Sequence, residues 1–210
     1  MHILVIGATG GTGRQIVDQA LRRGHTVTAL VRNPRRVRTR HERLRVVEGN
    51  VLDPAAVADA MRGADAVLCA LGHKRWIVPT TTLSRGTNNI VSAMEANGVK
   101  RLVCETSLGV GDSWGRLGLQ YTLFIVPFII FFYYVDKGRQ ERIIRSSALD
   151  WTIVRPGRLT NGPQRGTYRY GENIGSYFLT VSISRADVAE FMMKQLDEKE
   201  NVHRTIAVAD

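Results

Sequence analysis

Short apolar runs alternate with amphipathic segments along the whole chain. An apolar run of about 4–8 residues is typical of a buried strand, whereas apolar residues repeated every three or four positions predict a helix. Strands are predicted at 2–6, 26–31, 44–48, 66–71, 101–105 and 151–154, with a candidate edge strand at 205–208. Helices are predicted at 12–23, 54–61, 87–97, 137–148 and 185–195.

The order of these elements decides the fold class. Strands and helices that alternate one by one form crossovers, which give a parallel sheet with helices on both faces. The chain shows no internal repeat and no linker long enough to divide it. The sequence therefore predicts a Rossmann-type, doubly wound, mainly parallel α/β sheet in a single domain over residues 1–210.

One segment departs from the alternation. Residues 117–135 carry no formal charge and are long enough to raise the question of a membrane span. Pro127 and the polar Gln120 and Thr122 interrupt the segment, and strands of one sheet are predicted on both sides of it. We expect no membrane contact, and a lid or an oligomer contact, or both, at about 109–135. The alternative is a buried helix that completes the core.

The charge balance narrows the class of partner. Lys and Arg outnumber Asp and Glu by 29 to 19, which gives a formal net charge of +10. Such a surface suits nucleic acid, an anionic membrane or an acidic small molecule, and the chain has no zinc-finger, basic-zipper or RNA-binding motif. We therefore expect a small-molecule substrate and no nucleic acid. The start lacks a signal peptide's basic region, and Cys69 and Cys104 lie in apolar runs, which indicates a cytoplasmic protein without a metal site.

A glycine-rich turn, Gly7-Ala8-Thr9-Gly10-Gly11-Thr12-Gly13, follows the first predicted strand and opens the first helix. One glycine allows a tight turn, a second lets the backbone approach a pyrophosphate, and a third lets helix and strand pack closely. The free N–H groups of the helix start then hold the phosphates. The placement between strand and helix makes this a strong dinucleotide-binding signal.

The residue at the end of the second strand selects the cofactor. Arg32 stands 19 residues after Gly13, and Arg35 and Arg36 follow it. An acidic residue there would bind the ribose hydroxyl of NAD, whereas arginine accommodates the additional phosphate of NADP. No acidic residue occurs in 31–40, so the sequence predicts NADP(H).

The G-x-x-G-x-x-G spacing resembles the short-chain dehydrogenase/reductase superfamily, in its extended and atypical branches. Residues 65–99, together with 7–17, 29–32 and 49–53, resemble the biliverdin-IXβ reductase (flavin reductase) group and the wider NmrA-like NAD(P)H-binding group. The resemblance is weak across 109–135. It implies these contacts: Gly7, Thr9, Gly10 and Thr12 at the pyrophosphate, Arg32 and Arg36 at the adenosine phosphate, Asn50 and Val51 beside the adenine, Leu71 and Gly72 near the nicotinamide ribose, and Pro156 near the nicotinamide.

Three side chains are candidates for catalysis. Ser107 ends the fifth strand, and Tyr133 and Lys137 share one face of the next helix because they are four residues apart. This pattern resembles the superfamily's set, in which lysine binds the ribose and lowers the tyrosine pKa while serine orients the substrate oxygen. The biliverdin-IXβ reductase group lacks the tyrosine and relies on the serine, with solvent supplying the proton. His73 and Trp76 are further candidates for the lining of the site.

The sequence favours an NADPH-dependent reductase whose substrate is a flavin, bilin, quinone or other conjugated carbonyl compound. Arg158 stands where the resembled group has histidine, Glu105 where it has cysteine, and Asn50 where members often have aspartate, so the substrate stays open. One alternative is a non-catalytic NADP(H)-sensing regulator of NmrA-like type. Another is a membrane-associated scaffold that uses 117–135.

Overall fold

Eight strands form one sheet in the order β3-β2-β1-β4-β5-β6-β10-β8. In this computed structural model, which describes residues 1–73 and 78–210, every neighbouring pair is parallel except β10 and β8. The strands are β1 (His2–Ile6), β2 (Thr26–Val31), β3 (Leu44–Glu48), β4 (Ala66–Cys69), β5 (Arg101–Glu105), β6 (Asp150–Pro156), β8 (Arg169–Gly171) and β10 (Arg204–Ala209). A separate parallel pair joins β7 (Arg158–Thr160) to β9 (Ser182–Ser184). The predicted mainly parallel Rossmann-type sheet is confirmed.

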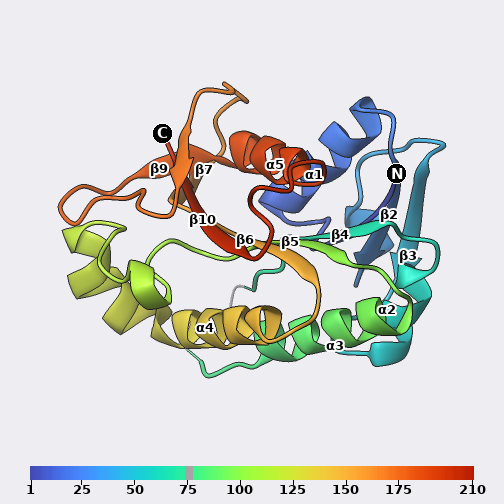
Figure 1. Cartoon of the computed structure of the whole chain (residues 1–210), viewed down its shortest axis with the longest axis horizontal. Coiled ribbons are helices and arrows are strands. Elements are labelled where there is room, and N and C mark those ends of the chain that lie inside the picture. The colour runs from blue at the N-terminus through green and yellow to red at the C-terminus, as the bar shows by residue number, and fades with distance from the viewer. Residues whose placement is uncertain (74–77) are drawn as a thin grey trace.

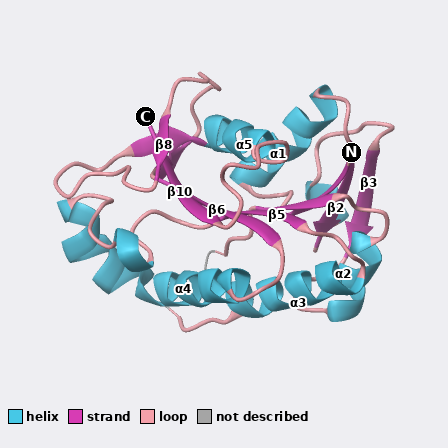
Figure 2. Ribbon diagram, viewed as in Figure 1, coloured by secondary structure: helices cyan, strands magenta, loops and turns pink. Residues whose placement is uncertain are grey.

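Helices cover both faces of the sheet (Figures 1 and 2). One layer holds α1 (Gly11–Arg22) and α5 (Arg185–Lys194), and the other holds α2 (Pro54–Met61), α3 (Thr82–Ala96) and α4 (Phe131–Arg145). Alternate residues of β1 serve the two layers, because Ile3 and Val5 pack into the first core while Leu4 and Ile6 pack into the second. A strand buried on both faces explains the unbroken apolar run.

The strand order reverses at the centre of the sheet. From β1 the chain builds outward through β2 and β3, and from β4 it builds in the other direction through β5 and β6. Ligands of open α/β sheets bind beyond the carboxyl ends of the strands at such a reversal. The glycine loop after β1 and Leu71 and Gly72 after β4 both lie at this point.

Two helices begin earlier than predicted. The structure starts α3 at Thr82 rather than at 87, and α4 at Phe131 rather than at 137. A long-range cap accounts for the first difference: buried Asp136 of α4 accepts hydrogen bonds from the N–H groups of Leu83 (2.9 Å) and Ser84 (3.2 Å). A cap supplied by a distant helix leaves no local signal.

The strand predicted at 205–208 is confirmed as β10, but its predicted place at the edge of the sheet is wrong. In the structure β10 lies inside the sheet, because β8 pairs antiparallel with its outer side. Strands β7, β8 and β9 were not predicted, since each has only three residues and shows no clear alternation.

The apolar segment forms a wide π-type helix, η3 (Tyr121–Ile130), which runs directly into α4. Only Val126 of η3 is buried, whereas Phe124 is 62% and Phe128 is 77% exposed. The alternative of a buried core helix is therefore wrong. By length and composition alone, the continuous helix Tyr121–Arg145 is long and apolar enough to cross a membrane, and 22% of its most apolar part is buried. Val126 packs beside Tyr133 and Tyr134, so the inner side of η3 borders the candidate catalytic residues.

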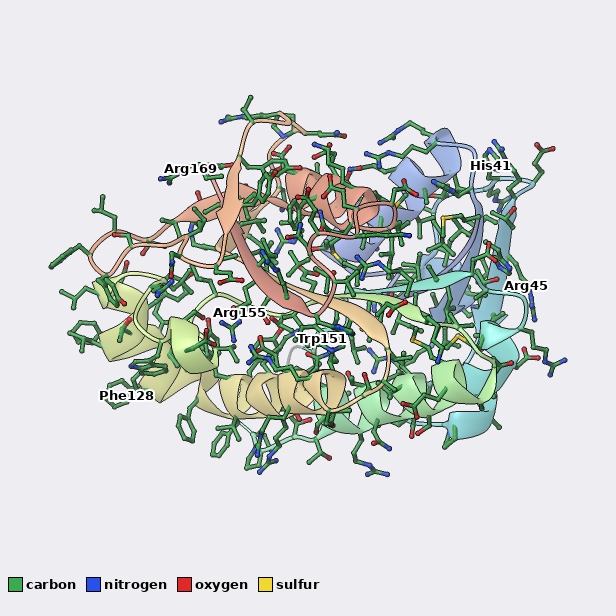
Figure 3. All side chains as sticks on the ribbon, in the orientation of Figure 1. His41, Arg45, Phe128, Trp151, Arg155 and Arg169 are labelled. Carbon is green, nitrogen blue, oxygen red and sulfur yellow. The ribbon has the colours of Figure 1, made fainter. Side chains whose placement is uncertain are left out.

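A buried ion pair fastens α4 to the sheet. Glu141 of α4 accepts two hydrogen bonds from Arg155 of β6, at 2.9 Å from Nε and 2.6 Å from a terminal nitrogen, and one from Thr106 at 2.8 Å. Both side chains of the pair are buried, and Arg155 lies between the sheet and α4 in Figure 3. Removing Glu141 leaves the buried charge of Arg155 with only the exposed Asp112, at 2.8 Å, as an acidic partner.

We expect Glu141→Ala to lower the free energy of unfolding by about 3–5 kcal/mol, the usual cost of breaking a buried pair. Urea titration followed by circular dichroism measures it. Arg62→Ala is the matched control, because its 2.6 Å pair with Asp59 is exposed and should contribute at most about 1 kcal/mol. Equal losses in the two variants would contradict this account.

Candidate active site

The glycine loop is shaped by backbone contacts that exclude side chains. Gly7 has a φ of +83°, and a Cβ on it would lie 2.3 Å from the carbonyl oxygen of Ala70. A Cβ on Gly13 would lie 2.1 Å from the carbonyl oxygen of Gly7. Gly10, the N-cap of α1, offers no side chain to cap the helix. The first N–H groups of α1 therefore remain available to an anion, and the loop fits a pyrophosphate.

The predicted arginines stand at the next strand end. Arg32 follows β2, and Arg35 and Arg36 lie on a short 3-10 turn, η1 (Pro34–Arg36), which Asn33 caps by accepting from the Arg35 N–H at 3.0 Å. All three arginines are exposed, and within the described residues none of them forms a salt bridge. Their charges are thus free to meet a phosphate next to the glycine loop.

Two further arginines border the loop and were missed by the sequence analysis. The Nε of Arg14, in the first turn of α1, is buried without a hydrogen-bond partner among the described residues. The side chain of Arg185, which opens α5, lies so close that a Cβ on Gly11 would come within 2.4 Å of its Cδ. Arg14 had a local signal, since it directly follows the glycine motif. Arg185 had none, because only the packing of α5 on α1 brings it there.

The predicted adenine side is organised by short contacts. Asn50 accepts from the Leu52 N–H at 3.1 Å, and Asn89 of α3 donates to the Val51 carbonyl at 3.0 Å. Val51 and Leu71 converge on Gly86, where a Cβ would lie 2.9 Å from one and 3.2 Å from the other. The structure thus brings these two predicted residues together.

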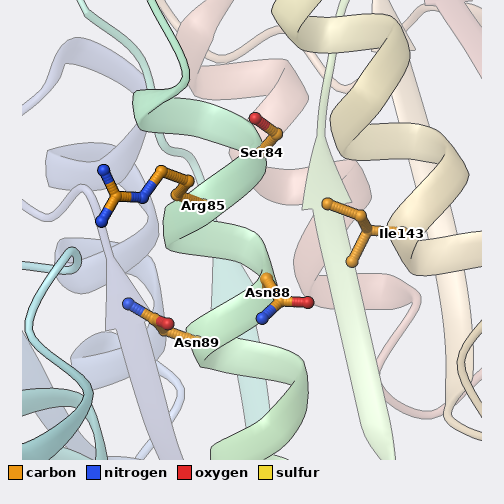
Figure 4. A pocket seen from close by; sticks show the side chains of 5 residues that line it. All are labelled: Ser84, Arg85, Asn88, Asn89 and Ile143. Atoms are coloured by element: carbon orange, nitrogen blue, oxygen red, sulfur yellow. The ribbon is translucent and has the colours of Figure 1, made fainter.

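An open hollow of about 280 Å³ lies between α3 and α4 (Figure 4). None of the predicted site residues lines this hollow. Its lining consists of Ser84, Arg85, Asn88 and Asn89 from α3 and Ile143 from α4.

Lys137 is buried and joins two strand ends. Its Nζ donates to the carbonyl oxygens of Leu71 (3.2 Å) and Glu105 (3.0 Å). Leu71 lies just after β4, and Glu105 is the last residue of β5. Burial alone lowers the pKa of Lys137, but the neighbouring acidic groups of Tyr133, Cys104 and Glu105 outweigh it, so that the pKa is raised. The lysine is therefore a charged, fixed part of the framework.

Tyr133 faces the loop after β4. Its hydroxyl lies 3.8 Å from the position of a Cβ on Gly72, and its ring meets the His73 ring edge-on at 5.0 Å between centroids. The Nζ of Lys137 lies 5.6 Å from the centre of the same ring. Tyr133, Lys137 and Gly72 are thus neighbours, while Trp76 lies outside the described residues.

Ser107 contacts a different tyrosine from the one in the predicted set. Its Oγ lies 3.0 Å from the hydroxyl of Tyr134, and Tyr134 donates to the Leu108 carbonyl at 2.8 Å. Burial raises the pKa of the Tyr134 phenol well above its usual range, so this phenol stays protonated. The Leu108 N–H donates to the Pro156 carbonyl at 3.0 Å, which places predicted Pro156 beside this loop.

Glu105 is a buried acid beneath the glycine loop. It accepts a hydrogen bond from the hydroxyl of Thr12 at 3.0 Å. The Thr12 side chain thus faces the protein interior, and its backbone N–H remains for a phosphate. Burial raises the pKa of Glu105, although Lys137, Thr12 and Arg185 oppose the shift.

A family model described as NAD(P)H-binding matches residues 7–199. The chain belongs to this NAD(P)H-binding family. The chain is also 32% identical over 215 residues to an uncharacterised chloroplast protein of Arabidopsis thaliana, covering 98% of this chain and 75% of that protein. The expected likeness to an NAD(P)H-binding group is confirmed.

Solved structures share the fold over the whole chain. The anaerobilin reductase ChuY from Escherichia coli O157:H7 superposes with a TM-score of 0.82 at 23% identity, over 100% of this chain and 97% of that one. A short-chain dehydrogenase/reductase from Veillonella parvula in complex with NADP gives a TM-score of 0.81 at 20% identity, over 100% and 94%. The chain thus shares its fold with a protein described as a reductase and with one crystallised with NADP.

We expect Glu105→Gln to raise the stability of the fold at neutral pH. An acid whose folded pKa is raised makes the folded state less stable as the pH rises above the ordinary range of a carboxyl, and the amide removes that cost. Urea midpoints at about pH 5 and about pH 8 should show a gain for the variant that grows with pH. Exposed Glu48→Gln is the control without such a gain. A variant that loses stability with rising pH relative to wild type would contradict the proposed burial effect.

Proposed function

We propose that the protein is an NADPH-dependent reductase that transfers hydride to a conjugated small molecule. One observation carries this proposal: the glycine loop, the neighbouring Tyr133 and Lys137, and Ser107 all lie at or just beyond the carboxyl ends of the adjacent strands β1, β4 and β5. Membership of the NAD(P)H-binding family supports it, as does the likeness to a protein described as a reductase.

The preference for NADPH rests on charge. Arg32 and Arg36 are exposed at the end of β2, where the adenosine end of a dinucleotide lies in folds of this class. Guanidinium groups form charge-assisted, often two-pronged, hydrogen bonds with phosphate. Arg14 and Arg185 would add positive charge at the pyrophosphate. The NADP complex of the Veillonella structure supports this choice.

The protein's own task is to place the substrate and to manage one proton. Bound NADPH supplies the hydride, and the reduced product gains one proton in addition. The Ser107 hydroxyl would donate to a carbonyl oxygen or ring nitrogen as negative charge grows there. Tyr133, beside Gly72, is the candidate proton donor, and buried Lys137 holds the loop ends together through its hydrogen bonds to the Leu71 and Glu105 carbonyls.

The charge around the candidate site favours an anionic, conjugated substrate such as a flavin, bilin or acidic quinone. Arg158 is exposed two residues after Pro156, so a positive charge stands near the proposed nicotinamide position. The formal net charge of +10 would draw an acidic substrate toward the protein.

One observation favours a second function, a non-catalytic NADP(H) sensor. Two of the three N–H groups of Lys137 are used by carbonyls, and Ser107 contacts Tyr134 and the Leu108 carbonyl. Side chains whose hydrogen bonds are already made within the protein can have a purely structural role. NADPH oxidation with a panel of flavins, bilins, quinones and aldehydes decides between enzyme and sensor.

We expect calorimetric titration to show tighter binding of NADPH than of NADH. Arg32→Ala should remove about 1.5–3 kcal/mol of NADPH binding and leave NADH almost unaffected, since only NADPH carries the additional phosphate. Arg22→Ala, exposed at the far end of α1, is the control. Equal affinities in the wild type, or an unchanged preference in Arg32→Ala, would refute the assignment.

Substitutions at the three candidate residues separate two proton sources. If Tyr133 is the acid, Tyr133→Phe should lower turnover about 10²–10⁴-fold, whereas solvent protonation makes it nearly silent. Ser107→Ala should lower turnover more than cofactor affinity in either case, because its hydrogen bond strengthens in the transition state. Lys137→Met should reduce both the turnover and the affinity for the cofactor.

Tyr170→Phe is the control for Tyr133→Phe, because it removes an exposed phenol on β8, away from the candidate site, and should leave turnover unchanged. Steady-state rates on one active substrate are the readout. Wild-type rates in Ser107→Ala, Tyr133→Phe and Lys137→Met would show that these three residues do not carry the reaction.

A further inference from the structure

Two apolar segments far apart in the sequence project from the same end of the molecule. One is η3 with the start of α4, and the other is the loop 177–179, both at the left of Figure 1. Backbone hydrogen bonds join their bases: the Leu119 N–H donates to the Phe178 carbonyl at 3.4 Å and the Ser176 N–H to the Arg116 carbonyl at 2.7 Å. We call this surface the apolar end.

The side chains of the apolar end point into solvent. Phe178 is 81% exposed, Leu179 is 74% exposed, and Phe128 extends away from the sheet in Figure 3. Neither 117–135 nor 174–181 contains a charged residue. Soluble monomers rarely expose a continuous apolar surface of this kind, so a partner must cover it. The exposed members are Leu119, Leu123, Phe124, Phe128, Ile129, Phe131, Phe132, Val135, Tyr177, Phe178 and Leu179.

Positive charge continues the same helical face. Phe131, Val135, Arg139 and Arg142 follow one another at intervals of three or four residues, so they lie on one stripe of α4. All four are exposed, and within the described residues Arg139 and Arg142 form no salt bridge. The acidic group of the preceding loop, Asp112, is paired with Arg155 at 2.8 Å. The stripe is thus apolar at one end and cationic at the other.

We propose that the apolar end binds the surface of an anionic lipid bilayer. The aromatic and aliphatic tips would enter the boundary between headgroups and acyl chains, and Arg139 and Arg142 would meet lipid phosphates. The occupant is identified by this charge pattern: a second copy would bring the same patch and another +10 chain against it, whereas an anionic membrane complements both parts. This proposal differs from the sequence-based expectation of no membrane contact.

The protein lies on the membrane and does not cross it. The apolar stretch 121–135 covers roughly 22 Å at ~1.5 Å per residue, less than the ~30 Å of the hydrocarbon layer. Beyond Val135 the helix is committed to the core, because Asp136, Lys137 and Gln140 are buried among α3 and the strand ends. Lipid binding of this kind is independent of the proposed reductase activity.

Flotation of the full chain with lipid vesicles tests the proposal. Vesicles of phosphatidylcholine alone are compared with vesicles that contain about 30% phosphatidylglycerol, at low and high salt. The wild type should float with the anionic vesicles and dissociate as salt is raised. Phe128→Ser combined with Phe178→Ser should weaken binding at least about tenfold, because two large apolar groups no longer enter the interface. Arg139→Gln with Arg142→Gln should remove the preference for anionic lipid.

Matched controls separate this surface from general stickiness. Val46→Ser on β3, at the opposite end of the sheet, and Arg22→Gln with Arg23→Gln on the far end of α1 should leave flotation unchanged. Melting curves verify that the variants fold. No binding to anionic vesicles, binding unaffected by the phenylalanine substitutions, or a stable dimer in sedimentation that these substitutions dissociate would each overturn the proposal.

Discussion

Close backbone packing at the carboxyl ends of β1 and β4 is the constraint on which the rest of the site depends. Gly7 passes Ala70, and Gly13 passes Gly7, at distances that leave no room for a side chain. This close packing lets α1 begin directly after the turn that follows β1, with no side chain to cap the N–H groups of its first turn. It also fixes the loop after β4, to which Lys137 then ties β5 and α4. A nucleotide-binding edge and a candidate catalytic group are therefore held in one rigid frame.

The sequence predicted the sheet because its signals are local. Apolar runs that serve two cores, such as β1, need no distant information, and the glycine motif predicts its own strand–turn–helix context. Predictions failed where a distant residue decides the outcome. Asp136 caps α3 from across the helix layer, and the three-residue strand β8 turns β10 from an edge into an interior strand. Such pairings appear only once the chain is folded.

In the candidate site, too, residues that belong to a local motif were predicted, whereas residues placed by long-range packing were not. Residues joined to a motif, such as Gly7, Gly10 and Arg32, stand where the pattern indicates, at the ends of neighbouring strands. The contact of Ser107 with Tyr134, in place of Tyr133, could not be predicted, because two adjacent helix residues point about 100° apart and only the packing of α4 selects one. Arg185 and Glu105 likewise reach the loop through contacts between elements far apart in sequence.

One helix serves both the interior and the surface of this protein. From residue 136 onward, α4 places four polar side chains in the interior, where each finds a hydrogen-bond partner in α3, the sheet or a strand end: Asp136, Lys137, Gln140 and Glu141. Its first five residues and η3 expose apolar side chains. The buried polar part fixes the orientation of the helix, and this orientation turns the apolar part outward. The exposed end is therefore a consequence of how the candidate site is held together, and a surface that covers it would lie next to Tyr133.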